Sequence, residues 1–224
     1  RIPKSQGTVI GATLMGATND GVVNAIKLLE EAGHEVVSFH STGAGGKVME
    51  ELIEEGIITA AMDLTLHEVV YEYFGYGFGY GAEGRLMSGV KKGIPMVVCP
   101  GGIDFMCQWK NAMFDDIDQR KYNWHNSTLA HVKLNTKEVT DISRIIIDRL
   151  NEAKPGNVVV VMPTDGFRSF SQKGQALYDK DVDNAIINTF EAHLKKDIPI
   201  KYIDANFMEM EFSRFAARQM LDLL

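Results

Sequence analysis

The stretch Glu35-Val-Val-Ser-Phe-His40-Ser-Thr-Gly43-Ala-Gly-Gly46-Lys47-Val-Met-Glu50-Glu-Leu-Ile-Glu-Glu55-Gly56 predicts a strand, a glycine-rich bend and an amphipathic helix. Glycine lets a backbone turn tightly and approach a ligand closely. A helix begins with unpaired N–H groups and a partial positive charge, which together favour an anion such as a phosphate or a carboxylate. The same pattern also occurs in strand-to-helix turns that bind nothing, so the loop alone leaves both interpretations open.

The alternation of strand and helix continues along the rest of the chain. Apolar strands are expected at 8–15, 35–40, 58–64, 95–99, 128–134, 157–162 and 198–203, and helices at 19–32, 46–55, from about 67, 137–153, 179–194 and 207–224. Strands that are apolar on both faces are typical of a sheet covered by helices on both sides. We therefore predict an α/β fold, a Rossmann-like, doubly wound and mainly parallel sheet of about six to seven strands, over residues 1–224 as a single lobe.

Composition narrows the classes of partner. The chain has 224 residues, 45% hydrophobic residues and a formal charge of −7, so a nucleic acid is not an expected partner. No uninterrupted apolar run of about 18 residues is present, so no membrane span is expected. Two cysteines are too few for a disulfide framework, and no signal peptide is visible. We expect a cytoplasmic protein.

Three well-known motifs are absent. Gly46-Lys47 is preceded by Ser41 where a Walker A loop has glycine and is followed by Val48 where it has Ser or Thr. The same Val48 replaces the last glycine of the dinucleotide-binding fingerprint. His67-Glu68 begins a zincin-like motif, but Tyr71 stands where the second histidine belongs. The sequence therefore supports neither a P-loop NTPase, nor an ordinary NAD enzyme, nor a zincin.

Polar residues gather where the predicted strands end, which is where open parallel sheets bind ligands. The candidates for binding a ligand or cofactor are Thr42, Gly43, Gly45, Gly46, Lys47, Asp63, Thr65, Gly101, Gly102 and Arg168. Several of them have a structural alternative, since Asp63 and Thr65 could cap a helix. A guanidinium at Arg168 could bind a phosphate or carboxylate with two hydrogen bonds, or pair with a surface acid.

Histidines and acids near the same edge suggest acid–base chemistry. His40 or His125 is the candidate general base, and Asp104 or Asp63 is the residue that would orient it. The segment from Asp104 to Asn126 is long for a connection, which favours a functional insert or an interface. No Cys/His spacing indicates zinc, and the ligands of any divalent metal such as Mg or Zn stay unknown.

Glycine alternates with aromatic residues from Tyr71 to Gly81. Such a segment could stack a nucleobase, but a surface flap or an interface is the favoured interpretation.

Several motifs, taken in order, resemble the UPF0261 family, the bacterial and fungal relatives of the plant tobamovirus-resistance ATP-binding protein. They are Phe39 to Glu50, Asp63-Leu-Thr65 with Glu68, Pro100 to Asp104, His125-Asn126, Pro163 to Phe167 and Tyr178-Asp179. The resemblance covers about Thr8 to Asp204 and is to the carboxyl-terminal half of that family. It implies two Rossmann-like lobes, of which the amino-terminal one is absent here or belongs to a separate chain, and an association with ATP.

Three hypotheses follow. The first is a lobe that binds a small anionic ligand, with ATP as the expected nucleotide, at the glycine-rich loop. The second is a metal-assisted hydrolase of a small oxo-acid, lactone or cyclic diketone, with loop amides holding an oxyanion. The third is a non-catalytic interaction module. A single lobe is expected to leave its cleft half-walled, so we expect a homo-oligomer or a partner lobe or subunit.

Overall fold

A six-stranded parallel sheet forms the centre of the molecule. The computed structural model describes residues 7–224. The sheet has the order β2-β1-β3-β4-β8-β9, and every neighbouring pair is parallel. This confirms the predicted doubly wound α/β fold. The strands are β1 Val9–Leu14, β2 Glu35–His40, β3 Ala60–Thr65, β4 Met96–Gly101, β8 Val158–Pro163 and β9 Ile200–Ile203.

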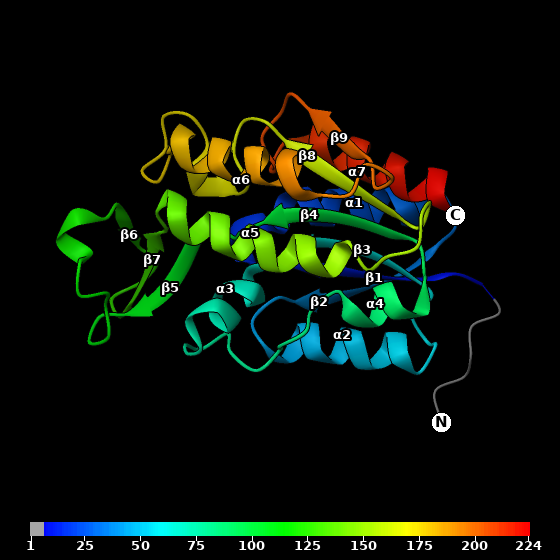
Figure 1. Cartoon of the computed structure of the whole chain (residues 1–224), viewed down its shortest axis with the longest axis horizontal. Helices are drawn as coiled ribbons and strands as arrows, with labels where there is room; N and C mark the ends of the chain where they lie inside the picture. The colour runs from blue at the N-terminus through cyan, green and yellow to red at the C-terminus, as the bar shows by residue number, and fades with distance from the viewer. Residues whose placement is uncertain (1–6) are drawn as a thin grey trace.

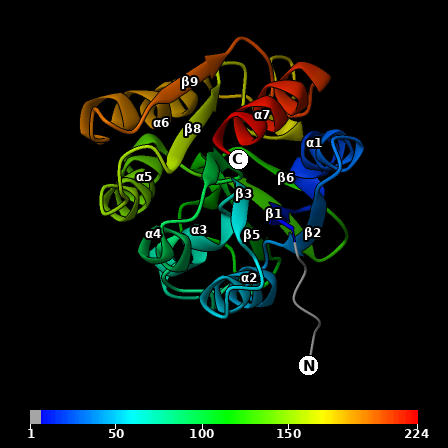
Figure 2. The same ribbon diagram turned by 90° about the vertical axis from the view of Figure 1, so that its right-hand side faces the viewer.

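Helices cover both faces of this sheet, as Figure 2 shows from the end of the molecule. The chain moves from β1 to β2 in one direction and through β3, β4, β8 and β9 in the other, so right-handed crossovers place the connecting helices on opposite faces. One face carries α1 (Asn19–Glu31) and α7 (Met210–Leu223). The other face carries α2 (Ala44–Glu54), α4 (Met87–Lys92), α5 (Thr136–Leu150) and α6 (Lys180–His193).

The long helix α5 shows how local sequence sets these elements. Asn135 accepts a hydrogen bond from the Glu138 amide at 2.9 Å, and Glu138 accepts one from the Asn135 amide at 2.8 Å. This reciprocal capping fixes the first turn. Buried residues recur along one stripe at Val139, Ile142 and Ile146, and they anchor the helix to the sheet.

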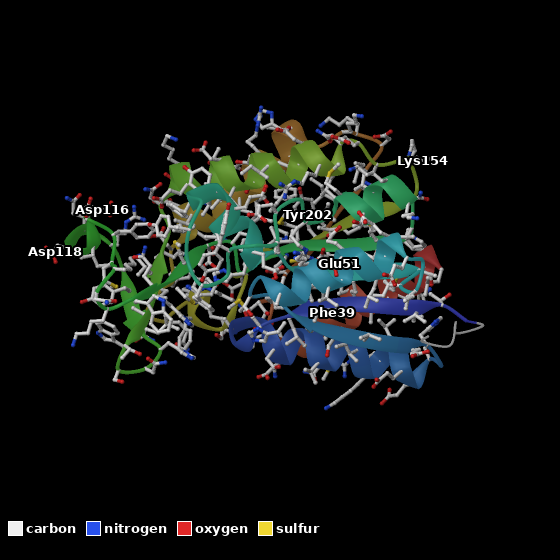
Figure 3. All side chains as sticks on the ribbon, turned by 90° about the horizontal axis from the view of Figure 1, so that it is seen from below. Phe39, Glu51, Asp116, Asp118, Lys154 and Tyr202 are labelled. Carbon is white, nitrogen blue, oxygen red and sulfur yellow. The ribbon has the colours of Figure 1, made fainter. Side chains whose placement is uncertain are left out.

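A second, antiparallel sheet projects from one end of the molecule (Figure 1). It has the order β5-β7-β6, formed by Phe105–Trp109, Leu129–Lys133 and Tyr122–Trp124. The strand expected at 128–134 therefore exists, but it pairs here and not in the parallel sheet. In Figure 3, Asp116 and Asp118 lie on this projecting end, and Lys154 lies at the opposite end. The projection extends beyond the carboxyl ends of the parallel strands, close to α3 (His67–Phe74).

The closing helix α7 is held tightly against the first helix. A Cβ at Gly21 or Gly101 would collide with Phe207, so both positions require glycine for this close approach. Phe207 also stacks on Phe212 with ring centroids 4.3 Å apart. The Ser213 hydroxyl donates a hydrogen bond to the Gly21 carbonyl at 2.9 Å, across almost the full length of the chain.

Candidate functional site

The carboxyl ends of β1 and β3 lie at the point where the strand order reverses. The chain leaves β1 for β2 on one side and returns to β3 on the other, which is the position where open α/β sheets bind their ligands. Beneath this point the Thr18 and Thr65 hydroxyls lie 2.9 Å apart, and the Thr65 amide donates to Thr13 at 3.0 Å. Thr65, predicted as a ligand-binding residue, thus joins two strand ends.

A pocket of about 500 Å³ opens beside this point. That volume falls within the usual range for small-molecule sites. Its walls come from the ends of β1 and β2, the projecting sheet, the aromatic–glycine segment and the 3-10 turn Ser169–Ser171. The lining residues are Met15, Gly16, Ala17, His40, Thr42, Phe78, Cys107, His125, Leu129, His131, Ser169 and Phe170.

Two of the predicted functional residues on the rim are hydrogen-bonded to each other. His40 ends β2, and its Nδ1 lies 2.9 Å from the Thr42 hydroxyl. The His40 side chain is exposed, and the contact fixes its ring orientation. This leaves Nε2 of His40 for a ligand or for proton transfer.

His125, the third predicted residue in the wall, belongs to a stack of rings. Its ring lies parallel to that of His131, with centroids 5.0 Å apart. Burial lowers the pKa of His131 to about 3, and the nearby Arg168 charge adds to the effect. His131 is therefore a neutral imidazole near pH 7. Its Nδ1 is buried without a hydrogen-bond partner.

The inner wall is closed by a buried group around His67. The Gly102 carbonyl accepts a hydrogen bond from His67 Nδ1 at 2.7 Å, and the Tyr71 hydroxyl lies 3.2 Å from Nε2. Burial, with a smaller contribution from Arg168, lowers the pKa of His67 to about 4. Burial likewise raises the pKa of the Cys107 thiol to about 11. Cys107 is therefore a thiol in the wall, not an activated nucleophile.

The glycine-rich loop differs from the prediction in one decisive respect. The Gly43 and Gly46 amides donate hydrogen bonds to Glu68 Oε1 at 2.7 and 3.0 Å. The anion at the start of α2 is thus the protein's own carboxylate. The expectation that these two amides are bare is wrong, and a phosphate does not fit the loop as folded. This contact is not visible in the sequence, because Glu68 belongs to a different strand–helix unit from the loop.

The other glycine-loop residues are structural in this arrangement. A Cβ at Gly45 would collide with the His40 carbonyl, so this glycine permits the close turn. The Lys47 amide donates to the Gly43 carbonyl at 3.2 Å and continues the helix. A Cβ at Gly101 would meet the Leu64 carbonyl. Of the residues predicted to bind a ligand, Thr42 is the one found in the pocket wall.

Glu68 also belongs to a buried ion cluster centred on Arg85. The Arg85 guanidinium donates to Glu68 and, at 2.6 Å, to Asp63 Oδ2, and its Nε lies 3.4 Å from Glu50. Asp63 Oδ1 accepts a further hydrogen bond from Thr13 at 2.7 Å. Burial raises the pKa of Glu68, although Arg85 and the two amides oppose the effect. Both carboxylate oxygens of Asp63, which was predicted to bind a ligand, are therefore hydrogen-bonded within the protein.

Asp104 and Arg168 form the core of a second buried ion cluster. Arg168 Nε donates to Asp104 Oδ1 at 2.8 Å, and Lys133 Nζ donates to Oδ2 at 2.7 Å. Burial pushes the pKa of Asp104 upward, but Arg168 and Lys133 outweigh it and hold the pKa well below its usual range. Both carboxylate oxygens are occupied by cations. Asp104 is absent from the residues that line the pocket with His40 and His125.

Asp183 completes this second cluster from helix α6. Its Oδ1 lies 4.0 Å from Lys133 Nζ, and both of its oxygens are buried without a hydrogen-bond partner. Burial raises the pKa of Asp183 to about 7, with Lys133 opposing the effect.

Arg85, His131, Lys133 and Asp183 were not among the residues predicted from the sequence, and Glu68 was named there without its structural role. Three of them carry a signal in retrospect. His131 and Lys133 alternate with Ala130 and Val132, so one face of a short strand is polar. Asp183 interrupts the buried stripe of α6 between Val182 and Ile186.

The residues described, 7–224, hold no group of three or more His, Cys, Asp or Glu side chains arranged for a metal ion. In the same range, every helix is too short or too polar to cross a bilayer.

Comparison with known proteins places the chain in a family. Residues 7–224 match the C-terminal domain of the uncharacterised protein family UPF0261. The chain is similar to a UPF0261 protein of Clostridium tetani, with 31% identity over 99% of this chain and 55% of the relative. It is similar to one of Brucella melitensis, with 25% identity over 94% of the chain and 50% of the relative.

A plant protein matches the same range. The ToMV resistance protein Tm-1(GCR237) of Solanum lycopersicum is 27% identical over 96% of this chain and 28% of its own length. The chain thus spans about half the length of the bacterial relatives and less of the tomato one. This chain therefore belongs to the UPF0261 family and corresponds to its C-terminal domain.

Proposed function

We propose that this lobe binds a small organic molecule in the pocket between the ends of β1 and β2 and the projecting sheet. The observation that carries the proposal is the pocket's position, because it opens where the strand order reverses. Its walls combine apolar and aromatic side chains with a few polar groups, as ligand sites generally do. Met15, Ala17, Leu129 and Phe170 supply apolar surface, and His40 and Thr42 supply polar atoms.

ATP remains a proposed ligand, but it would bind in this pocket and not at the glycine-rich loop. The flat faces of Phe78, Phe170 and His125 suit a planar ring. The glycine loop does not serve the phosphates, because Glu68 occupies its amides. The lining residues include neither Lys nor Arg, which weakens the case for a triphosphate.

A titration followed by thermal denaturation tests the proposal. Adenosine, ATP with magnesium and a set of small aromatic compounds are added to the protein and to Gly16→Leu. A Cβ at Gly16 meets no neighbouring atom, so the larger side chain can fill the pocket without disturbing the fold. Val37→Leu, at an exposed position of β2, is the matched control.

We expect at least one compound to raise the melting temperature of the wild type and of Val37→Leu, and to have no effect on Gly16→Leu. Equal binding by Gly16→Leu would exclude this pocket. Absence of stabilisation by the whole set would count against a small-molecule lobe.

A hydrolase is the second candidate, and the His40–Thr42 contact favours it. A histidine whose Nδ1 is held in place can accept a proton from water at Nε2. Asp104 no longer orients the base, since Arg168 and Lys133 occupy it, and no metal enters this proposal. Hydrolysis of lactones and cyclic diketones is measured for the wild type and His40→Asn. Turnover that His40→Asn abolishes supports the idea, and an inactive wild type opposes it.

An interaction role is the third candidate, supported by exposed aromatic side chains. Tyr76, Tyr80, Trp109 and Trp124 are each more than 40% exposed on the aromatic–glycine segment and the projecting sheet. They could contact a second copy, or the part of the longer relatives that this chain does not span. Light scattering after size-exclusion chromatography tests self-association. A wild-type dimer that Trp109→Ser converts to a monomer supports it, and a wild-type monomer opposes it.

A further inference from the structure

The guanidinium of Arg168 is buried with four of its five N–H donors unused. Its side chain is 0% exposed, and Nε is bonded to Asp104. Nη1 and Nη2 are both buried and have no hydrogen-bond partner. Buried polar groups are almost always hydrogen-bonded, and leaving one unpaired is unfavourable, more so when it is charged. Such a pair of nitrogens has the geometry that binds a carboxylate with two hydrogen bonds.

The charges around Arg168 also leave a positive excess. Arg168 and Lys133 are two buried cations that share one bonded carboxylate, Asp104. Asp183 makes no hydrogen bond to either cation, and its raised pKa of about 7 keeps part of it protonated in neutral solution. An uncompensated buried charge is strongly unfavourable, so this cluster attracts an anion.

This unpaired guanidinium lies next to the pocket. Its Cζ is 4.0 Å from the centre of the Phe105 ring, and that ring is 4.8 Å from the ring of His131, which lines the pocket. The two residues that follow Arg168, Ser169 and Phe170, also line it. His131 Nδ1 is a second buried atom without a partner on this side. Of these two groups, His131 lines the cavity, whereas Arg168 contacts Phe105 and directly precedes the lining residues Ser169 and Phe170.

We propose that the pocket binds a monoanionic organic acid with a planar or apolar body, whose carboxylate pairs with Nη1 and Nη2 of Arg168 and with Nδ1 of His131. The proposal rests on the proposed function, since it names the class of ligand that occupies the same pocket. The apolar wall accommodates the body of the ligand, and the guanidinium neutralises its single charge. The proposal requires the Phe170 or His131 side chain to rotate so that the carboxylate reaches Arg168.

The charge count separates this ligand from a nucleotide. One unpaired guanidinium matches one negative charge, whereas the triphosphate of ATP carries several. The pocket lining offers no further Lys or Arg. The chain as a whole is also acidic, with a formal charge of −7, which disfavours a polyanion.

The test compares benzoate with benzamide, which have nearly the same shape and differ in charge. Binding of each to the full chain is followed by two-dimensional NMR, together with the imidazole resonances of His131. We expect benzoate to bind at least tenfold more tightly than benzamide. We also expect benzoate to raise the pKa of His131, because the bound carboxylate offsets the Arg168 charge.

Arg168→Lys keeps the positive charge but removes the two Nη atoms that could each bind one carboxylate oxygen. We expect it to weaken benzoate binding at least tenfold and to leave benzamide binding unchanged. Lys137→Gln, on an exposed position of α5, is the control and should match the wild type. Should Arg168→Lys fail to fold, the wild-type comparison of the two probes still decides the question.

The outcomes distinguish this proposal from the broader one. If benzamide or adenosine binds as tightly as benzoate, the preference for an acid is wrong, but the proposal of a small-molecule pocket is still supported. Tighter binding of ATP than of benzoate at the same residues would also overturn it. Failure of all these probes to bind would count against both proposals.

Discussion

Two arginines of this lobe, Arg85 and Arg168, are both fully buried, yet their surroundings are opposite. Arg85 faces three carboxylates, from Glu50, Asp63 and Glu68. Arg168 shares a single carboxylate with Lys133, and two of its nitrogens have no partner. The first cluster has a surplus of negative charge and the second a surplus of positive charge.

This difference separates a structural role from a binding role. Backbone amides stabilise part of the surplus negative charge around Arg85, because Glu68 also accepts hydrogen bonds from the Gly43 and Gly46 amides. Around Arg168, Asp183 lies 4.0 Å from Lys133 without a hydrogen bond, and no group described in residues 7–224 hydrogen-bonds Nη1 or Nη2 of Arg168. Arg85 Nε also lacks a hydrogen-bond partner, but it lies 3.4 Å from a Glu50 carboxylate oxygen, whereas both terminal nitrogens of Arg168 are unpaired. A buried cation surrounded by carboxylates stabilises the fold, and one whose terminal nitrogens lack partners indicates a ligand.

The largest expected effect is at Arg85. Arg85→Gln leaves Asp63 and Glu68 as uncompensated buried charges, so we expect a loss of about 3–5 kcal/mol in the free energy of unfolding. Urea denaturation measures it. Arg168→Gln should cost less, because Asp104 keeps Lys133 as a partner. An equal or larger loss of unfolding free energy in Arg168→Gln would contradict the proposed difference between the two arginines.

The next effect depends on pH and concerns Asp183. Its pKa is raised from 3.8 to about 7, so the folded state holds a proton that the unfolded state releases between these values. Stability is therefore lost as the pH rises from about 4 to 7, by about 4 kcal/mol. Asp183→Asn should remove this loss, and it should be more stable than the wild type at pH 8 but not at pH 4. Parallel pH profiles for the two proteins would contradict the assignment.

A smaller effect is expected at Glu68. Glu68→Gln preserves the side-chain shape but weakens the hydrogen bonds from Gly43 and Gly46 and the ion pair with Arg85. We expect a loss of about 1–3 kcal/mol, measured by thermal denaturation. The variant also tests whether the glycine-rich loop can bind an anion from solution. Stabilisation by phosphate in Glu68→Gln but not in the wild type would show that Glu68 blocks such a site.

The smallest effect is expected at an exposed ion pair. Lys137 and Asp141 lie 2.6 Å apart on the surface of α5, with the Lys137 side chain 80% exposed. Solvent screens such pairs, so Lys137→Gln should leave the denaturation midpoint unchanged. A clear shift would mean that burial does not explain the difference between ion clusters in this protein.

The parallel sheet and most helices could be predicted because their signals are local. Uninterrupted apolar runs marked β1 and β8, and the regular stripe of α5 marked a helix. The projecting sheet could not be predicted in the same way. Its strands β5 and β6 are short, and their pairing with β7 depends on contacts across the insert that carries Asp116 and Asp118.

The site was predicted in part. His40, Thr42 and His125 were named from the sequence and do share a pocket. The role of the glycine loop was misjudged, because one distant carboxylate, Glu68, decides whether its amides are available. Asp63 lies near the end of β3, and Asp104 lies between β4 and β5. Their cationic partners, however, are separated from them in the sequence and are found only in the fold.

The close packing of Phe207 and Ser213 against Gly21 affects how the chain folds during synthesis. Helix α1 emerges from the ribosome early, but the helix that covers its apolar side comes last. Until then, one face of the growing sheet is open to water and to other nascent chains. The lobe can acquire its final packing only once translation has passed Ser213, and a truncation before Phe207 would leave that face bare.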